Sequence, residues 1–155
     1  MKKTNAARIL DRHKQPYALC SYPVDENDLS VAHVAKSIGV SSAQLFKTLV
    51  TRNEKHEPLI AVVPGDKELN LKALASIAGC KKCTMLPEKE LLEVTGYIRG
   101  GCSPLGMKKQ YPTFIDQSAL EHEEIWVSAG MRGKQLKLSP HTLVKVLGAQ
   151  VATLG

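Results

Sequence analysis

The 155-residue sequence contains few aromatic residues and no long apolar segment. Phenylalanine, tryptophan and tyrosine together make up 5% of the chain, so a surface that stacks many nucleic-acid bases is not expected. No apolar run approaches the roughly 20 residues that a helix needs to cross a bilayer. The basic start, Met1-Lys2-Lys3, is not followed by the apolar core of a signal peptide. We therefore expect a cytoplasmic protein that does not bind membranes.

Cysteine is also scarce, with four residues in the chain, at positions 20, 80, 83 and 102. Without a secretory signal, these cysteines are expected to be reduced thiols. Cys80 and Cys83 have the spacing of a metal-binding or redox pair, but no second pair follows and the five histidines lack ligand spacing. We predict no metal and no cofactor. A redox role for this pair stays open as a lesser alternative.

The rest of the composition is ordinary for a globular protein, with 43% hydrophobic and 23% charged residues. The formal net charge of +6 permits a polyanionic partner without requiring one. We find no repeat, no low-complexity segment and no linker. A chain of this length can bury one core, so we expect residues 1–155 to form a single domain.

Strand and helix patterns alternate irregularly along the chain. The continuously apolar segment 59–63 predicts a central strand, and a polar capping residue precedes most of the predicted helices. Helices are predicted over 5–13, 31–38, 71–78, 88–94 and 141–147. Strands are predicted over 17–21, 46–51, 59–63, 82–85, 112–116, 125–128, 135–138 and 151–152. This order favours a mixed sheet with helices around it over a strictly parallel array.

The most unusual stretch is GGCSPLG at 100–106, with Lys108 and Lys109 just behind it. Three glycines and a proline exclude a helix or a central strand and predict a shaped loop, whose N–H groups can face a phosphate or the oxyanion of acyl transfer. A second loop of small residues, 128–133, carries Arg132. Two such loops with basic neighbours favour a cradle for an anion, although a plain connector between strands is the alternative.

Lys47 is the most interesting charged residue, because it lies between Phe46 and the apolar pair Leu49-Val50 in a predicted strand. Alternation along the strand places Phe46 and Thr48 on one face and Lys47 on the other. The lysine either extends to solvent or faces a cleft, where its charge would attract a phosphate or polarise a carbonyl. Cys102 is a candidate nucleophile only if a histidine lies near it in space, and none is near it in sequence.

Five of these segments resemble the YbaK family in order and spacing. They are FKTL at 46–49, LNLK at 69–72, TGY at 95–97, GGCSPLG at 100–106 and VSAGMRG at 127–133. YbaK proteins are free-standing relatives of the editing domain of bacterial prolyl-tRNA synthetase. The resemblance spans nearly the whole chain. It implies an α+β fold with a curved, mostly antiparallel mixed sheet that approaches a barrel and is surrounded by short helices.

The resemblance also implies a function, that of a trans-acting deacylase that clears cysteine mischarged onto tRNA(Pro). Its partners would be the acceptor end of aminoacyl-tRNA and, in addition, prolyl-tRNA synthetase. In the implied reaction the thiol of the bound cysteinyl group attacks its own ester carbonyl, which releases the tRNA and leaves a cyclic thioester. Backbone N–H groups at Gly101 and its neighbours would face the oxyanion.

Individual residues are assigned by the same resemblance. Lys47 matches the essential lysine of the family and Gly101 the loop glycine at the active centre, so these two are the expected catalytic residues. The expected substrate-binding residues are Tyr22, Thr48, Asn70, Gly100, Ser103, Pro104, Ser128 and Gly130. The expected tRNA contacts are Lys108, Lys109 and Arg132.

The sequence departs from the family pattern at two places that touch the expected pocket. Ser30-Val31 stands where members often have Phe-Gly, and Ala129-Gly130-Met131 where they often have Gly-Gly-Lys. An editing deacylase of other specificity, such as one that removes alanine by water attack, is therefore an alternative. A module that binds tRNA or a synthetase without turnover is another, and a thiol-redox protein is a third. Cys102 stands at a position that is usually apolar in relatives, which argues against it as a nucleophile.

Overall fold

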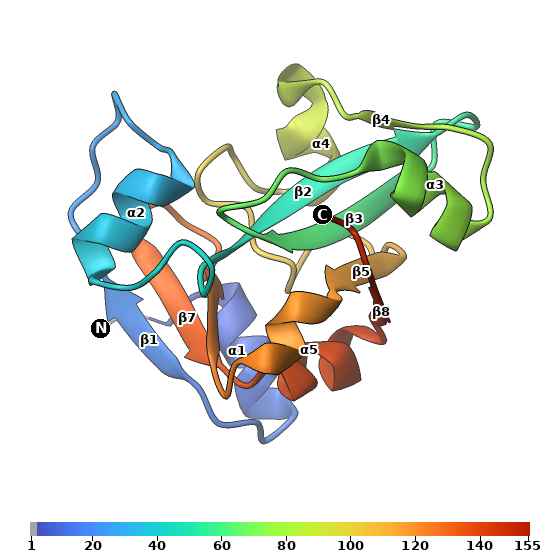
Figure 1. The fold of residues 1–155 in the computed structure, drawn as a ribbon. Coiled ribbons are helices and arrows are strands. Elements are labelled where there is room, and N and C mark those ends of the chain that lie inside the picture. Colours follow the sequence, from blue (N-terminus) through green and yellow to red (C-terminus); the bar gives the residue numbers. More distant parts are fainter. Residues whose placement is uncertain (1–2) are drawn as a thin grey trace.

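The computed structural model describes residues 3–155 and contains two β-sheets with helices around them (Figure 1). The smaller sheet is antiparallel and has the strand order β1 (Ala18–Ser21), β7 (Lys134–Leu138) and β6 (Ile125–Ser128). The larger sheet has the order β4 (Cys83–Met85), β2 (Phe46–Asn53), β3 (Pro58–Pro64), β5 (Thr113–Asp116) and β8 (Gln150–Ala152). Its first three strands are antiparallel, and β3, β5 and β8 are parallel. The predicted mixed α+β fold is therefore confirmed.

The two sheets meet where β2 begins. Leu45 forms an isolated bridge with Trp126, and the Trp126 N–H donates to the carbonyl of Gln44 at 2.9 Å. Each sheet keeps its own edge strands in the described chain, so the curved assembly does not close into a barrel.

β3 is the central strand that its apolar sequence predicts. Residues 59–64 are all buried, because Leu59, Ala61 and Val63 pack toward α3 and Val62 packs into the core on the other face. Strands β2 and β5 pair with the two edges of β3. The terminal strand β8 lies at the edge of the sheet, also as predicted.

The helices begin and end at residues whose side chains explain the boundaries. They are α1 (Asn5–Arg12), α2 (Val31–Ile38), α3 (Leu71–Ala78), α4 (Leu91–Thr95) and α5 (Pro140–Leu147). Thr4, Ser30, Asn70 and Ser139 each accept a hydrogen bond from a backbone N–H in the first turn of a helix.

The prediction of a helix over 88–94 was wrong in detail. Pro87 is extended, a 3₁₀ turn (Glu88–Glu90) follows it, and α4 begins only at Leu91. A second 3₁₀ turn, Gln117–Glu121, was not predicted.

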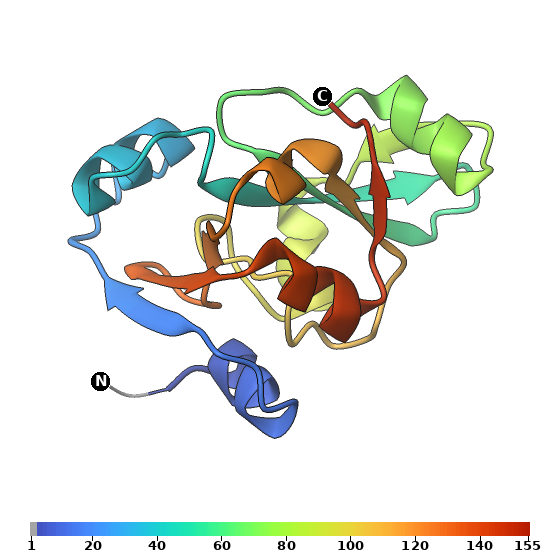
Figure 2. The same cartoon turned by 60° about the horizontal axis from the view of Figure 1, so that its bottom comes forward.

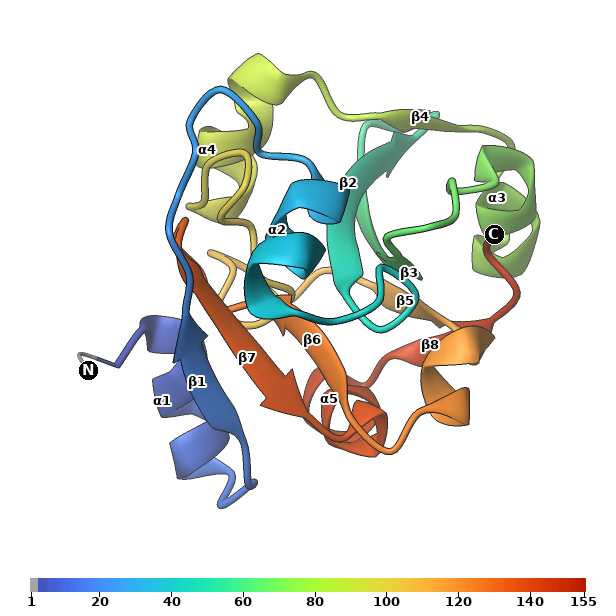
Figure 3. The same ribbon diagram turned by 60° about the vertical axis from the view of Figure 1, so that its left-hand side comes forward.

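Three apolar clusters hold these layers together. The largest lies among the two sheets, α1 and α5, and a second lies between the larger sheet and α3. In the third, Val34 and Ala35 of α2 pack on Leu45 and Trp126. Helix α2 therefore covers the junction of the two sheets, as Figure 3 shows.

The C-terminal segment returns to the start of α3 (Figures 1 and 2). Its Leu154 is fully buried, with its carbonyl accepting from the Asn70 N–H at 2.6 Å and its own N–H donating to Asp116 Oδ1 at 2.8 Å. None of the helices within residues 3–155 has the length and apolar character needed to span a membrane.

Candidate functional site

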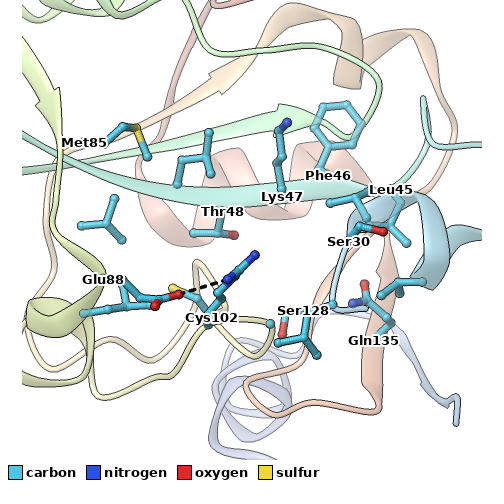
Figure 4. A pocket seen from close by; sticks show the side chains of 18 of the residues that line it. Ser30, Leu45, Phe46, Lys47, Thr48, Met85, Glu88, Cys102, Ser128 and Gln135 are labelled. Carbon is cyan, nitrogen blue, oxygen red and sulfur yellow. Dashed lines mark ion pairs between the residues drawn. The ribbon is translucent and has the colours of Figure 1, made fainter. Parts of the chain in front are cut away.

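A cavity of about 390 Å³ lies at the junction of the two sheets, a size typical of ligand sites. Helix α2, strand β2, the segment after β4 and both predicted loops contribute to its wall (Figure 4). The lining residues named in the following argument are Tyr22, Ser30, Val31, Lys47, Thr48, Glu88, Arg99, Gly100, Cys102, Ser128 and Gln135. Apolar side chains from α2, β2 and β4 form much of the remaining wall. Segments that are far apart in the sequence thus meet at one hollow.

Lys47 belongs to the lining, but its ammonium group does not point at the loops. In Figure 4 the side chain leaves β2 on the side opposite to Thr48, away from Cys102 and Ser128. This is the alternation expected of a strand. Within the described chain Lys47 takes part in no ion pair. Its ammonium group therefore lies beside the strand and does not reach the part of the cavity next to Ser128.

Gly101 lies where the two loops touch. A Cβ atom at this position would be 3.0 Å from the backbone N of Arg132 and 3.1 Å from the Cα of Met131, so only glycine fits without movement. The Gly101 N–H donates to the carbonyl of Ile98 at 2.9 Å. The expectation that this N–H faces an oxyanion is thus corrected, because the group already has an acceptor.

The neighbours of Gly101 are better placed to receive negative charge. Gly100 and Cys102 both line the cavity. Their N–H groups donate to no acceptor within residues 3–155. Backbone donors of this kind are what an oxyanion requires.

The thiol of Cys102 is a poor nucleophile in this environment. Burial raises its pKa to about 11, and a hydrogen bond with Thr95 opposes the shift only in part. A thiol with this pKa is almost entirely protonated at neutral pH, and the reactive species is the thiolate. Among residues 3–155, no histidine lines the cavity to act as a base.

Two buried oxygen atoms in the cavity wall have no hydrogen-bond partner in the described chain. They are Thr48 Oγ1 and Gln135 Oε1. Leaving a buried polar atom without a partner costs about 1–3 kcal/mol, so such atoms mark places where a ligand can donate. Gln135 was missed from the sequence. Gln135 could have been found only from its position opposite Ser128, and that position is known only once β6 and β7 are paired.

Of the other predicted substrate-binding residues, Tyr22, Gly100 and Ser128 line the cavity. Ser128 Oγ accepts from the Gly130 N–H at 3.2 Å and so shapes the second loop. Asn70 lies elsewhere, because its side chain caps α3 by accepting from the Ala73 N–H.

The remaining predicted residues support the loops and are not part of this cavity's wall. Ser103 is fully buried and its hydroxyl accepts from the Leu105 N–H. Pro104 and Lys109 line a separate cavity next to α1. Lys108 is exposed and its backbone N–H donates to the carbonyl of Thr95.

Tyr97 joins the two loops, a role that the sequence did not indicate. Its hydroxyl donates to the carbonyl of Leu105 at 2.6 Å. A Cβ atom at Gly106 would lie 2.7 Å from this hydroxyl oxygen, and one at Gly130 would lie 3.1 Å from the ring. Burial raises the pKa of Tyr97 to about 12, so the hydroxyl stays protonated and keeps donating. Arg132 connects the second loop to the segment before the first loop, because its Nε–H donates to the carbonyl of Arg99 at 2.8 Å.

An ion pair between Arg99 and Glu88 lies at the cavity, drawn as the dashed line in Figure 4. Its closest atoms are 3.5 Å apart, and the two side chains are 69% and 66% exposed. Exposed pairs contribute little stability, so either partner can turn to a ligand at small cost. No group of three potential metal ligands occurs among the residues that the structure describes.

Comparisons with known proteins agree on one family. Residues 25–146 match the model of the aminoacyl-tRNA editing domain. A protein of Enterococcus faecalis named "Putative Cys-tRNA(Pro)/Cys-tRNA(Cys) deacylase EbsC" is 46% identical over 153 residues, which are 99% of this chain and 93% of that protein. A proline–tRNA ligase of Geotalea daltonii is 37% identical over 79 residues, which are 51% of this chain and 14% of the ligase.

Solved structures give the same picture. A "putative trans-editing enzyme for prolyl tRNA synthetase" superimposes with a TM-score of 0.83 at 25% identity, covering 99% of this chain and 98% of that one. The crystal structure of hypothetical protein APE2540 superimposes with a TM-score of 0.89 at 26% identity, covering 97% of this chain and 99% of that one.

Proposed function

Because the chain belongs to the aminoacyl-tRNA editing domain family, we propose that it is a trans-acting deacylase that removes cysteine from tRNA(Pro). The observation that carries the proposal is the cavity at which the Lys47 strand and the two touching loops meet. The relative from Enterococcus faecalis, which is named for this activity, supports the substrate. Residues 1–155 would act as one editing domain, and the ligase relatives suggest prolyl-tRNA synthetase as a partner.

The reaction requires the enzyme to hold its substrate more than to attack it. The thiol of the cysteinyl group attacks the ester carbonyl, a carbon–sulfur bond forms, and the ribose oxygen leaves with the thiol proton. Water then opens the cyclic thioester to free cysteine. An unperturbed thiol has a pKa near 8.5, so the substrate is far more easily ionised than Cys102. Holding thiol and carbonyl together contributes through proximity.

The cavity offers a partner for each part of this substrate. Thr48 Oγ1 and Gln135 Oε1 would accept hydrogen bonds from the α-ammonium group or the thiol. The N–H groups of Gly100 and Cys102 would face the oxyanion. Lys47, on the other side of β2, would bind the terminal adenosine or its phosphate.

Replacing Lys47 tests the assignment. We expect Lys47→Ala to fold normally and to lose at least about 100-fold in kcat/KM on cysteinyl-tRNA(Pro), because a phosphate contact is lost. Lys145→Ala, which removes an exposed lysine from α5, is the matched control and should be as active as the parent protein. Equal kcat/KM values for the two variants would show that Lys47 does not take part in substrate binding or catalysis.

A second candidate function, editing of alanine by water attack, is favoured by the wall of the cavity. Ser30 and Val31, which depart from the family pattern, both line it. A panel of cysteinyl-, seryl- and alanyl-tRNA(Pro) separates the candidates, because only cysteine carries the thiol. Fast release of alanine with slow release of cysteine would favour the second candidate. Retention of every tRNA without release of any amino acid would indicate a binding module.

A further inference from the structure

Two thiols lie in contact on the side of the larger sheet that α3 covers. Cys80 Sγ and Cys83 Sγ are 3.4 Å apart. Cys83 is buried against α3, whereas Cys80 is partly exposed. A disulfide needs a sulfur–sulfur distance of about 2.05 Å, so small side-chain rotations would bring the pair to bonding distance.

The turn that brings the thiols together is fixed from both ends. Gly79 is left-handed, and the Cys80 N–H donates to the carbonyl of Ala75 at 3.0 Å. The carboxylate of Glu54, in the hairpin between β2 and β3, accepts from the Lys81 N–H at 3.0 Å. Cys83 then enters β4 opposite Asn53. These backbone hydrogen bonds therefore hold the two cysteines close enough for their sulfur atoms to touch.

A separate cavity of about 570 Å³ borders this pair. In the part of the chain that the structure describes, its charged lining residues are Lys72, Lys81 and Lys82, and none of its lining residues is acidic. Among the described residues, it shares no lining residue with the cavity at the junction of the two sheets. A small molecule that reaches Cys80 here would meet three lysine side chains and, beside the same turn, the single carboxylate of Glu54. The excess of positive charge favours an anionic molecule.

We propose that Cys80 and Cys83 form a thiol–disulfide exchange site that accepts small anionic disulfides. The site stands apart from the deacylation reaction and does not depend on it.

The exchange balances in two steps. The Cys80 thiolate attacks one sulfur of the small disulfide, a mixed disulfide forms, and the other half leaves as a thiolate. Cys83 then loses its proton to solvent and attacks Cys80 Sγ, which releases the second half as a thiolate. The protein thiols are oxidised by two electrons, and the small disulfide is reduced to two thiols.

The order of attack follows from the surroundings of each thiol. Burial, together with the hydrogen bond and charge of Cys80, raises the pKa of Cys83 to about 12. Cys80 is the more exposed partner and therefore reacts first. Once Cys80 is in a mixed disulfide its charge no longer raises the Cys83 pKa, but burial and the charge of Glu54 still do. We therefore expect the second step to be slower than the first at neutral pH.

The test begins with the reduced full-length protein and oxidised glutathione. We expect the loss of two thiols per chain, a mass lower by two hydrogens, and a disulfide-linked peptide that contains Cys80 and Cys83. Cys83→Ser should keep one glutathione on Cys80, while Cys80→Ser should react at neither position. Cys20→Ser is the matched control and should behave as the parent protein. Thermal melting confirms that each variant is folded.

The charge preference is tested with a cationic reagent, cystamine. The rate with each reagent is divided by its rate with the urea-unfolded chain, which removes differences in intrinsic reactivity. We expect this ratio to be several-fold higher for oxidised glutathione, and the Lys81→Gln, Lys82→Gln double variant to lose the preference while Lys145→Gln keeps it. Failure of the folded protein to link Cys80 to Cys83, or equal reactivity of Cys80→Ser, would overturn the exchange site. Equal ratios for the two reagents would overturn its anionic preference.

Discussion

At the scale of single residues, two oxygen atoms in the cavity wall, Thr48 Oγ1 and Gln135 Oε1, lower the stability of the folded protein. Both are buried without a partner in the described chain, and both lie in its wall. An apolar residue of similar size would avoid the cost of a buried acceptor without a partner. Their retention in the wall is explained if a substrate donates to them.

The Gln135→Met variant tests this trade between stability and function. We expect its free energy of unfolding to be unchanged or about 1 kcal/mol higher, because an unpaired acceptor is removed. Its kcat/KM on cysteinyl-tRNA should fall by about ten- to 100-fold, since a hydrogen bond to the substrate is lost. Urea denaturation and a deacylation assay give the two numbers. A large loss of stability with unchanged activity would assign Gln135 to the core instead.

Gly101 is required for the space it leaves, and not for a left-handed backbone. It is absent from the residues with positive φ, whereas a Cβ atom here would press on the backbone of residues 131–132. We expect Gly101→Ala to push the loops apart and to reduce kcat/KM by about 100-fold, because displacements of about 1 Å in a site can have this effect.

Gly148→Ala is the control for that prediction. Gly148 has positive φ and free space around its Cβ position, so alanine there should cost about 1–2 kcal/mol of stability and leave activity per folded molecule unchanged. If Gly101→Ala showed the same behaviour, close packing of the loops would not matter to the reaction.

At the scale of elements, the loops 100–106 and 128–133 behave as one unit because Tyr97 stands between them. The Tyr97→Phe variant keeps the ring and removes the hydrogen bond to Leu105. We expect a loss of about 1 kcal/mol in stability and a larger relative loss in kcat/KM, as the wall of the cavity loosens. Hydrogen exchange at the amides of both loops should rise in this variant. Faster exchange in only one loop would show that Tyr97 does not couple them.

At the scale of the whole molecule, Asp116 ties the C-terminal segment to the larger sheet. Burial raises the pKa of Asp116, but hydrogen bonds from Ser118 and from the N–H groups of Leu154 and Gly155 outweigh it and leave the pKa below its ordinary value. The folded state therefore gains stability from this carboxylate above the unfolded pKa of about 3.9 and loses it as the pH falls through the lower folded value.

The Asp116→Asn variant should accordingly be less stable than the parent protein by about 1–3 kcal/mol at pH 7. The difference should shrink in acid, since the parent carboxyl group is then protonated and neutral as well. Urea denaturation at neutral pH and at a pH below the folded pKa measures it. A difference that is constant with pH would mean that the charge of Asp116 is not what holds the segment.

Local features of the fold were predictable because they depend on neighbours in the sequence. Capping side chains at Thr4, Ser30 and Asn70, and the apolar run 59–63, fix helix starts and a central strand through contacts a few residues away. The late start of α4 was missed, because extended Pro87 and a 3₁₀ turn precede it. Glycine and proline predicted the first loop, because they exclude regular structure, whereas the assignment of both loops to a site came from their basic neighbours and from the family resemblance.

The sequence by itself determined the class of fold, the strand that carries Lys47 and the two loops rich in small residues, since propensity and periodicity act over short distances. Only the tertiary structure decided that the missing side chain of Gly101 lets the two loops touch, and that Gln135 faces the cavity. Each of these depends on which strands pair and which backbones touch. Such contacts between distant segments are set by the packing of the whole chain and leave no mark on the local sequence.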